Sequence, residues 1–415
     1  MITSRQCLLS LSITCAFAAQ ANSTTQQEIA VLRQEVQQLK VLLEQQKQQQ
    51  VQAGQALAQI QTQTQKLNTP SDLQYKFYGN VRLDALYQIR GSAADRLYNN
   101  INKVPLKGNN ESKDRLKSTL SATRLGLDIK NKINGQDISG KLEVDFLGGS
   151  NFDALRIRHA YVNYDGWLLG QTWSNFAVPD YMPETIDALG YVGGSVKRTV
   201  QARYTYPFDA KTQLVIAAED PKDASSKMRL PALTLRLNHQ INDDGRFSLR
   251  TMVDEKHSEQ HSKTAWGVGL GLQYALQPQT TFKADYYHVN GDSSFVSWTN
   301  PGFLVSANQT DLLGNSFDSI TAGVTHQFDE KWRTTLAYGY MKSHFDDDYL
   351  KAATNPTEIN KEMWQAWANV FYSPVKPLSF GIEYIYGERT AAVAAQNGST
   401  KGEDNRFNLV AIYNF

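Results

Sequence analysis

Two arginines stand two positions apart in the stretch Leu155-Arg-Ile-Arg-His-Ala-Tyr-Val162. If this stretch is a β-strand, Arg156 and Arg158 share one face and are separated by roughly 7 Å. A guanidinium group binds a carboxylate through two parallel hydrogen bonds, so this pair predicts a grip on both ends of a small dicarboxylate. The structural alternative is that the arginines pair with Glu143 and Asp145 on a neighbouring strand. The two interpretations are compatible.

Metal or catalytic chemistry has weaker support. His257 and His261 have the spacing of a helical metal pair, but they lie where a strand end or a loop is expected. The acidic run 346–348 suits a solvated loop. The sequence contains no Gly-x-Ser-x-Gly, His-Glu-x-x-His or P-loop motif. We therefore expect no metal, no cofactor and no enzymatic activity.

The elements that would position these residues follow a period of two from Tyr75 onward. In the stretch 75–87, Phe77 and Leu83 fall on one face, and Arg82 and Asp84 fall on the other. Sixteen segments of this kind can be placed, an even number as in bacterial membrane barrels. Their residue ranges are 75–90, 117–132, 135–148, 153–165, 166–176, 196–207, 210–220, 230–241, 244–256, 263–276, 279–291, 316–328, 330–343, 362–373, 376–388 and 402–415.

Short and long connections alternate between these segments. Tight turns are expected at Asn134-Gly135, Asp165-Gly166, Asp209-Ala210, Asp243-Asp244-Gly245, Gln277-Pro278 and Asp329-Glu330. Long polar connections are expected at 91–116, 221–229, 292–315, 344–361 and 389–401. Short turns at one end and long loops at the other are typical of an outer-membrane barrel. The final alternating strand ends on Phe415, the aromatic terminus that barrel assembly recognises.

A soluble all-β protein is the competing architecture. Its strands would face a dry protein core, which does not accept unpaired charges. Here the polar faces repeatedly carry charged residues. The predicted fold is therefore an all-β transmembrane barrel of about sixteen antiparallel strands over residues 75–415.

The inward-facing charges are predicted from this register, which a slip of one residue would reverse. The acidic set is Asp84, Asp128, Glu143, Asp145, Asp285 and Glu383. The larger basic set, our candidate solute-binding residues, is Arg82, Arg124, Lys141, Arg156, Arg158, Arg203, Arg236, Arg250, Lys283, Arg333 and Arg406. Such an excess predicts a positive lumen that concentrates anions.

The third long loop, residues 177–195, is predicted to fold inward and narrow the channel. Its prolines and the Gly-Gly pair at 193–194 suit a compact segment. Its acidic residues Asp180, Glu184 and Asp187 are the candidate constriction residues. An ordinary surface loop is the alternative.

The N-terminal residues differ from the rest. Arg5, the apolar stretch 7–17 and Ala19-Gln20-Ala21 predict a secretory signal peptide over residues 1–21. Both cysteines, Cys7 and Cys15, lie within it. A lipoprotein acylated at Cys15 is an alternative that the preceding Ile and Thr fit poorly.

Residues 24–69 are rich in Gln, and their apolar positions repeat at alternating spacings of three and four. This pattern predicts an α-helical coiled coil in the periplasm, with polar interruptions. The helix ends at Pro70, and residues 70–74 form a linker. The alternative is a disordered Gln-rich segment.

Bulk properties agree with this interpretation. The 415 residues carry a formal net charge of +1, which gives no reason to expect a nucleic-acid partner. A low mean hydropathy is normal for a barrel whose strands alternate apolar and polar residues, and 20 Tyr, 17 Phe and 7 Trp suffice for aromatic girdles.

The combination resembles a known family. The Gln-rich arm, the stretch Phe77-Tyr-Gly-Asn-Val-Arg-Leu-Asp-Ala85, the stretch 155–162 and Leu168-Leu-Gly-Gln-Thr-Trp-Ser-Asn-Phe176 are similar to DcaP-like outer-membrane porins. This resemblance implies a sixteen-stranded trimeric porin of the gram-negative outer membrane with its arms in the periplasm. It also implies a channel for small anionic solutes, dicarboxylates among them. No individual solute contact is carried over.

Two hypotheses follow. The first is an anion-preferring diffusion porin, a homotrimer held through its coiled coil and barrel walls in contact with membrane lipid and lipopolysaccharide. The second is a structural anchor whose coiled coil bridges to periplasmic partners.

Overall fold

The structure, a computed structural model, describes residues 73–92, 97–109, 111–223, 229–257, 261–306 and 311–415, with the isolated positions Gln37 and Glu44. The chain divides into two units, residues 1–72 and 73–415. The predicted signal peptide and, apart from those two positions, the predicted coiled coil lie outside the described residues. The barrel unit is described below.

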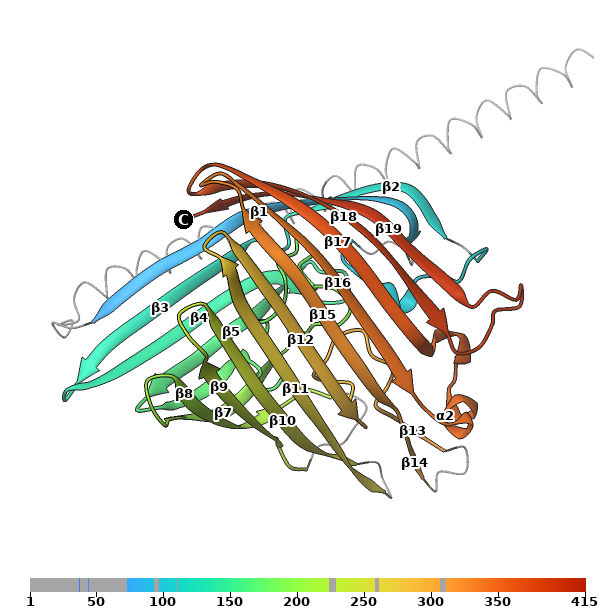
Figure 1. Cartoon of the computed structure of the whole chain (residues 1–415), viewed down its shortest axis with the longest axis horizontal. Coiled ribbons are helices and arrows are strands. Elements are labelled where there is room, and N and C mark those ends of the chain that lie inside the picture. The colour runs from blue at the N-terminus through green and yellow to red at the C-terminus, as the bar shows by residue number, and fades with distance from the viewer. Residues whose placement is uncertain are drawn as a thin grey trace, which may run out of the picture. The chain divides into compact units, whose positions relative to one another are not determined.

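The described residues form one 17-stranded antiparallel sheet and a separate two-stranded ribbon. The strands run side by side around the barrel (Figure 1). Their bounds are β1 (Gln74–Ser92), β2 (Ser112–Thr119), β3 (Arg124–Ile133), β4 (Gln136–Gly148), β5 (Ala154–Tyr164), β6 (Trp167–Trp173), β7 (Arg198–Pro207), β8 (Thr212–Asp220), β9 (Ala232–Gln240), β10 (Gly245–His257), β11 (Ser262–Gln277), β12 (Thr280–Asn290), β15 (Ser316–Gln327), β16 (Trp332–His344), β17 (Asn360–Val375), β18 (Leu378–Ala391) and β19 (Lys401–Asn414). The ribbon is β13 (Phe303–Val305) with β14 (Leu312–Gly314).

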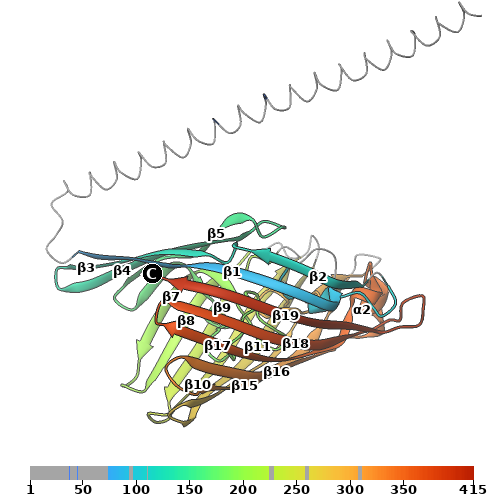
Figure 2. The ribbon, with the colours of Figure 1, turned by 90° about the horizontal axis from the view of Figure 1, so that it is seen from above.

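The sheet closes into a ring of sixteen strand positions. Each strand pairs with the next, and β1 pairs with β19 from Asn80 opposite Asn414 to Arg90 opposite Asn405. Both β2 and β3 pair with β1, so together they occupy one position of the ring. The sequence predicted one strand over 117–132, whereas the observed strand is interrupted at residues 120–123. Figure 2 shows β1 beside β19 and β2.

The last residue completes the seam. Phe415 and Gly79 exchange two backbone hydrogen bonds of 3.0 and 3.1 Å. The Phe415 side chain is exposed on the outer wall.

Deleting Phe415 is expected to reduce assembly into the outer membrane more strongly than refolding in detergent. Refolding loses only two of the many seam hydrogen bonds, each contributing about 1 kcal/mol net. Quantifying folded protein in outer-membrane fractions, and refolded protein in detergent, checks this. Phe415→Tyr keeps an aromatic terminus and is the control. Equal surface amounts for deletion and parent would contradict the role of this residue as an assembly signal.

The alternation predicted from the sequence is present. Val81, Leu83 and Leu336 are exposed on the outer wall, whereas Asp84 and Thr335, on the opposite face of the same strands, are buried inside. The predicted tight turns at 134–135 and 165–166 have positive φ angles at both central residues. Such angles belong to hairpin turns whose twist matches that of the flanking strands.

The helices are short: η1 (Ile101–Lys103), α2 (Asp347–Ala352) and η2 (Pro356–Glu358). Among the described residues no helix is long and apolar enough to cross a membrane.

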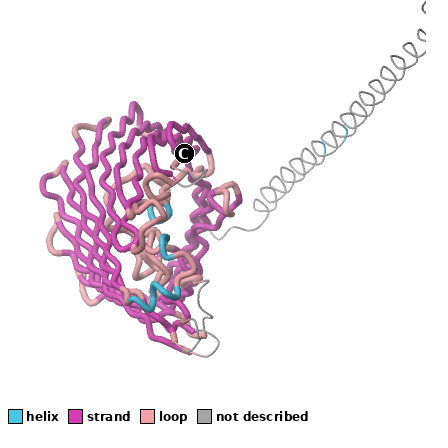
Figure 3. Tube along the Cα trace, turned by 90° about the vertical axis from the view of Figure 1, so that its right-hand side faces the viewer, coloured by secondary structure: helices cyan, strands magenta, loops and turns pink. Residues whose placement is uncertain are grey.

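Several long connections turn into the barrel, although the sequence analysis treated 91–116 and 292–315 as polar outer loops. Figure 3 shows loop and short helical segments within the curve of the strand wall. Their apolar side chains form a buried cluster with residues of the inner wall, including Ile101, Phe176, Val192, Phe295 and Tyr287. A hydrophobic core therefore forms inside part of the barrel, and the loops rest on it.

Candidate solute pathway through the barrel

The loop between β6 and β7, residues 174–197, is held at its start by hydrogen bonds to two buried charged groups. The Glu219 carboxylate accepts hydrogen bonds from the Asn175 backbone N–H at 2.8 Å and from the hydroxyls of Thr199 and Thr234. The Arg250 guanidinium donates to the Phe176 carbonyl at 3.2 Å and pairs with Asp285. The start of the loop is therefore held by side chains of β8 and β10, on the same side of the ring as its own strand β6.

The middle of the loop is fixed by Glu383 of β18, whose carboxylate is completely buried. Five donors converge on it at 2.6 to 3.3 Å: the side chains of Thr185, Tyr191, Asn369 and Asn408, and the backbone N–H of Ile186. Three of these donors belong to the loop, so Glu383 joins the middle of the loop to β18.

Glycines allow the loop backbone to lie directly on the wall. A Cβ atom at Gly339 of β16 would lie 1.7 Å from the Val192 carbonyl oxygen, far inside van der Waals contact. Gly193 has a φ of 95°, and a Cβ atom there would lie 2.1 Å from the Ile320 carbonyl oxygen. The small residues that alternate along β16 therefore serve this close approach.

Three predicted lumen arginines hold the same loop. Arg333 binds the Glu184 carboxylate through three contacts of 2.9 to 3.1 Å. Arg406 pairs with Asp187 at 3.1 Å. Arg82 pairs with Asp84 at 2.6 Å and donates to the Ile186 carbonyl.

Two members of the predicted basic set are thus withdrawn from the lumen. Arg250 is 0% exposed and Arg406 is 2% exposed, because the loop covers both. Their guanidinium groups anchor the loop and do not meet a passing solute. Two of the three candidate constriction acids, Glu184 and Asp187, are neutralised by arginines, whereas Asp180 is 45% exposed with Arg236 3.9 Å away.

The wall formed by β3, β4 and β5 carries the arginine pair first noted in the sequence. Arg156 binds Asp145 at 2.7 Å, and Arg158 binds Glu143 at 2.6 Å and Asp145 at 3.0 Å. The cross-strand pairing considered from the sequence is present. Arg124 adds a third cation, with its Nε 3.6 Å from Glu143.

A β-bulge shapes this cluster. Val144 pairs with Ile157 while the adjacent Glu143 pairs with His159, so Arg158 is the extra residue of β5. The bulge buries Arg158 and His159 consecutively, and His159 hydrogen-bonds Thr172 at 2.9 Å. A bulge re-aims side chains in this way, and strict alternation cannot anticipate it.

Two other cations on the inner face of the barrel form no ion pair with an acidic residue among the described residues. Arg203 on β7 and Lys283 on β12 share a face with buried inward residues, yet neither makes an ion pair there. Lys141, by contrast, pairs with Asp128 at 2.6 Å.

The sequence analysis missed Arg198, which stacks over Trp173 at 4.2 Å from the ring centroid and lies beside Arg156 and Arg158. Arg198 is the first residue of β7, and strict alternation would place it on the opposite face from Arg203. The adjacent Lys197-Arg198 pair was the available signal.

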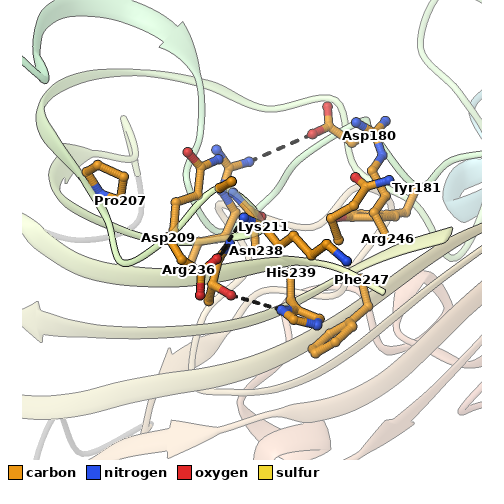
Figure 4. Close-up of a pocket in the computed structure, with 14 residues that line it drawn as sticks. Asp180, Tyr181, Pro207, Asp209, Lys211, Arg236, Asn238, His239, Arg246 and Phe247 are labelled. Atoms are coloured by element: carbon orange, nitrogen blue, oxygen red, sulfur yellow. Dashed lines mark hydrogen bonds and ion pairs between the residues drawn. The ribbon is translucent and has the colours of Figure 1, made fainter. Parts of the chain in front are cut away.

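A hollow of about 470 Å³ lies at the short-turn end of the barrel, next to Asp180 and Tyr181 of the inward loop. Figure 4 shows Lys211, Arg236 and Arg246 around it, with Asp180 pointing toward Arg236. In outer-membrane barrels the short turns are on the periplasmic side, so we call this hollow the periplasmic-mouth hollow.

The His257 and 346–348 segments, weighed above as metal ligands, make other contacts. His257 hydrogen-bonds Ser262 at 2.8 Å, and Asp348 pairs with Lys351 at 2.8 Å. Within the described ranges no group of three His, Cys, Asp or Glu side chains is arranged to hold a metal ion.

A closed sixteen-position barrel, apolar outside, charged inside and crossed by an inward loop, defines an outer-membrane channel of the porin class. The model of the DcaP outer membrane protein family matches residues 9–415, and the chain belongs to that family. None of the curated protein sequences matches it.

Solved structures agree with this assignment. The outer membrane channel DcaP of Acinetobacter baumannii is 35% identical with a TM-score of 0.75, covering 84% of this chain and 99% of that one. An anion-selective porin from Comamonas acidovorans is 12% identical with a TM-score of 0.59, covering 83% and 100%. OmpT of Vibrio cholerae, in a trimer form, is 14% identical with a TM-score of 0.55, covering 83% and 100%. The last two share the fold alone.

Proposed function

We propose that this porin passes small hydrophilic solutes and prefers anions, dicarboxylates among them. The observation that carries the proposal is an imbalance of charge pairing. Glu184 and Asp187 of the inward loop are paired with arginines, and the fully buried Glu219 and Glu383 are surrounded by hydrogen-bond donors. Arg203 and Lys283 make no ion pair among the described residues, so their positive potential acts on the lumen.

The arginine pair supports the dicarboxylate part of the proposal in a modified form. Arg156 and Arg158 use part of their donors on Asp145 and Glu143, and the Arg156 side chain is still 32% exposed. Carboxylates pin the two guanidinium groups, and the exposed part of Arg156 is what a solute can reach, since the Arg158 side chain is 8% exposed. A pinned guanidinium loses less conformational entropy when it binds.

The test is the reversal potential of the purified protein in a planar bilayer under a KCl gradient. We expect an anion-selective potential, followed by current block with small dicarboxylates. A cation-selective potential would overturn the proposal. A barrel without conductance would favour the structural anchor.

We also propose a homotrimer, with the segment 24–69 as a periplasmic coiled coil that supports assembly. Deleting residues 24–69 is expected to leave single-channel conductance and selectivity unchanged, because the barrel closes through β1 and β19 alone. The mass of the detergent-solubilised particle then reports whether the trimer survives. A deletion variant with altered selectivity would contradict an accessory role for this segment.

A further inference from the structure

The periplasmic-mouth hollow combines features of a binding site. It is bounded by the turn between β7 and β8, by the ends of β9 and β10, and by Asp180 and Tyr181 of the inward loop. Its volume of about 470 Å³ is within the range of small-ligand sites. Such sites are usually apolar, whereas this one presents three cationic side chains.

Two of these cations, Lys211 and Arg246, belong to exposed residues and form no ion pair within the described ranges. The Lys211 backbone is fixed on both sides, by its N–H to Asp209 at 2.7 Å and by its carbonyl to the Gln240 N–H at 2.9 Å. The Lys211 ammonium itself has no partner among the described residues. In the same part of the chain, the hydrogen bond of the Arg246 side chain goes to a neutral acceptor, Gln273, at 2.9 Å.

Arg236 is the third cation, and its contacts give the strongest argument for an anionic ligand. Its Nε is buried and has no hydrogen-bond acceptor within the described part of the chain. Among the described residues Arg236 forms one ion pair, with Asp180, which is 3.9 Å away and 45% exposed. A buried donor without an acceptor is costly, so this geometry favours an anionic ligand.

The hollow also contains two carboxylates, Asp180 and Asp209, so its three cations leave a net charge of +1. Asp209 accepts two hydrogen bonds of 2.7 Å from the backbone of its own turn, at Lys211 and Thr212. His239 is engaged with Thr212 at 3.0 Å. Asp180 forms an ion pair with Arg236, but at 3.9 Å this contact is long.

We propose that the periplasmic-mouth hollow is a binding site for polyvalent oxyanions, held by Lys211, Arg236 and Arg246, with Asp180 as an internal competitor. The two guanidinium groups suit the planar oxygens of carboxylate or phosphate, and the ammonium adds a point charge. Three separate cations favour a solute with at least two anionic groups over chloride. Asp180 stands in for one anionic group of the solute and keeps binding weak enough for release.

This inference rests on the proposed anion preference and adds sidedness to it. The probe is inorganic pyrophosphate, added in turn to each side of one inserted channel. We expect block from one side to be stronger than from the other. Lys211→Gln/Arg246→Gln is expected to weaken the stronger block about tenfold, to the level of the weaker side, because two charge-assisted contacts are lost.

The matched control is Lys331→Gln/Lys376→Gln. These lysines are exposed in other short turns of the same barrel end, so the double variant removes the same charge away from the hollow. It is expected to retain the asymmetric block. Asp180→Asn is expected to strengthen the block about threefold by removing the competitor of Arg236.

Symmetric block in the parent, or equal block by Lys211→Gln/Arg246→Gln and the parent, would overturn the site. The reversal potential in KCl separates this failure from failure of the proposed function. Anion selectivity with symmetric block removes only the periplasmic-mouth site, whereas cation selectivity removes both.

Discussion

Glu383→Ala is expected to increase single-channel conductance and current noise, and to lower the free energy of unfolding by roughly 3 kcal/mol or more. The Glu383 carboxylate is fully buried and accepts hydrogen bonds from five donors, three of them on the inward loop. Its removal leaves these donors unsatisfied beside a cavity. The loop then loses its central contact with β18 and fluctuates, and each movement out of the lumen widens the open path.

Conductance in a planar bilayer and denaturant unfolding in detergent measure the two effects. The control is Glu388→Ala on the same strand, where Glu388 pairs with the exposed lysines Lys401 and Lys107. Surface ion pairs contribute about 0–1 kcal/mol, so this variant should resemble the parent. A Glu383→Ala channel with parental conductance would mean that the remaining contacts of Arg333, Arg406 and Arg250 hold the loop without it.

The strand pattern could be predicted because a membrane barrel repeats one simple constraint. Lipid selects apolar residues outside and water selects polar residues inside, so period-two alternation fixes the facing of Asp84, Glu143 and Glu383. The same constraint fixes the number of strand positions, and Asn-Gly or Asp-Gly pairs fix the turns.

The packing inside the barrel depends on contacts between residues far apart in the sequence, which local sequence patterns do not predict. Asn99 of one loop meets Gln365 of β17 at 2.9 Å, and Ser195 of another donates to the Phe295 carbonyl. Such pairings depend on which loops share the lumen. For that reason the sequence identified Arg250 and Arg406 as inward but could not show that the inward loop would cover them.

Local irregularity accounts for the other differences. The bulge at Arg158 places His159 inward, and the break between β2 and β3 divides one predicted strand. Alternation did not identify Arg198, because side chains at a strand end do not alternate strictly between the two faces.

Arg156→Gln/Arg158→Gln is expected to remove the net positive charge of the β4–β5 wall and shift selectivity toward cations. The parent cluster has four cations, since Arg124 and Arg198 lie beside the pair, against two carboxylates, for a net charge of +2; the variant has two cations against two carboxylates, for a net charge of 0. At about 8 Å from a permeating ion in water, two unit charges contribute on the order of 1 kcal/mol, or about fivefold in the permeability ratio.

The reversal potential at low and high salt measures this shift, which should shrink at high salt as screening increases. Adding Glu143→Gln and Asp145→Asn to the double variant leaves Arg124 and Arg198 as the charges of the cluster. We expect this quadruple variant to regain anion preference, because its net charge is again +2. If the double variant keeps parental selectivity, the cluster lies away from the narrowest point. The unpaired Arg203 and Lys283 would then set the preference, and their joint neutralisation would carry the effect instead.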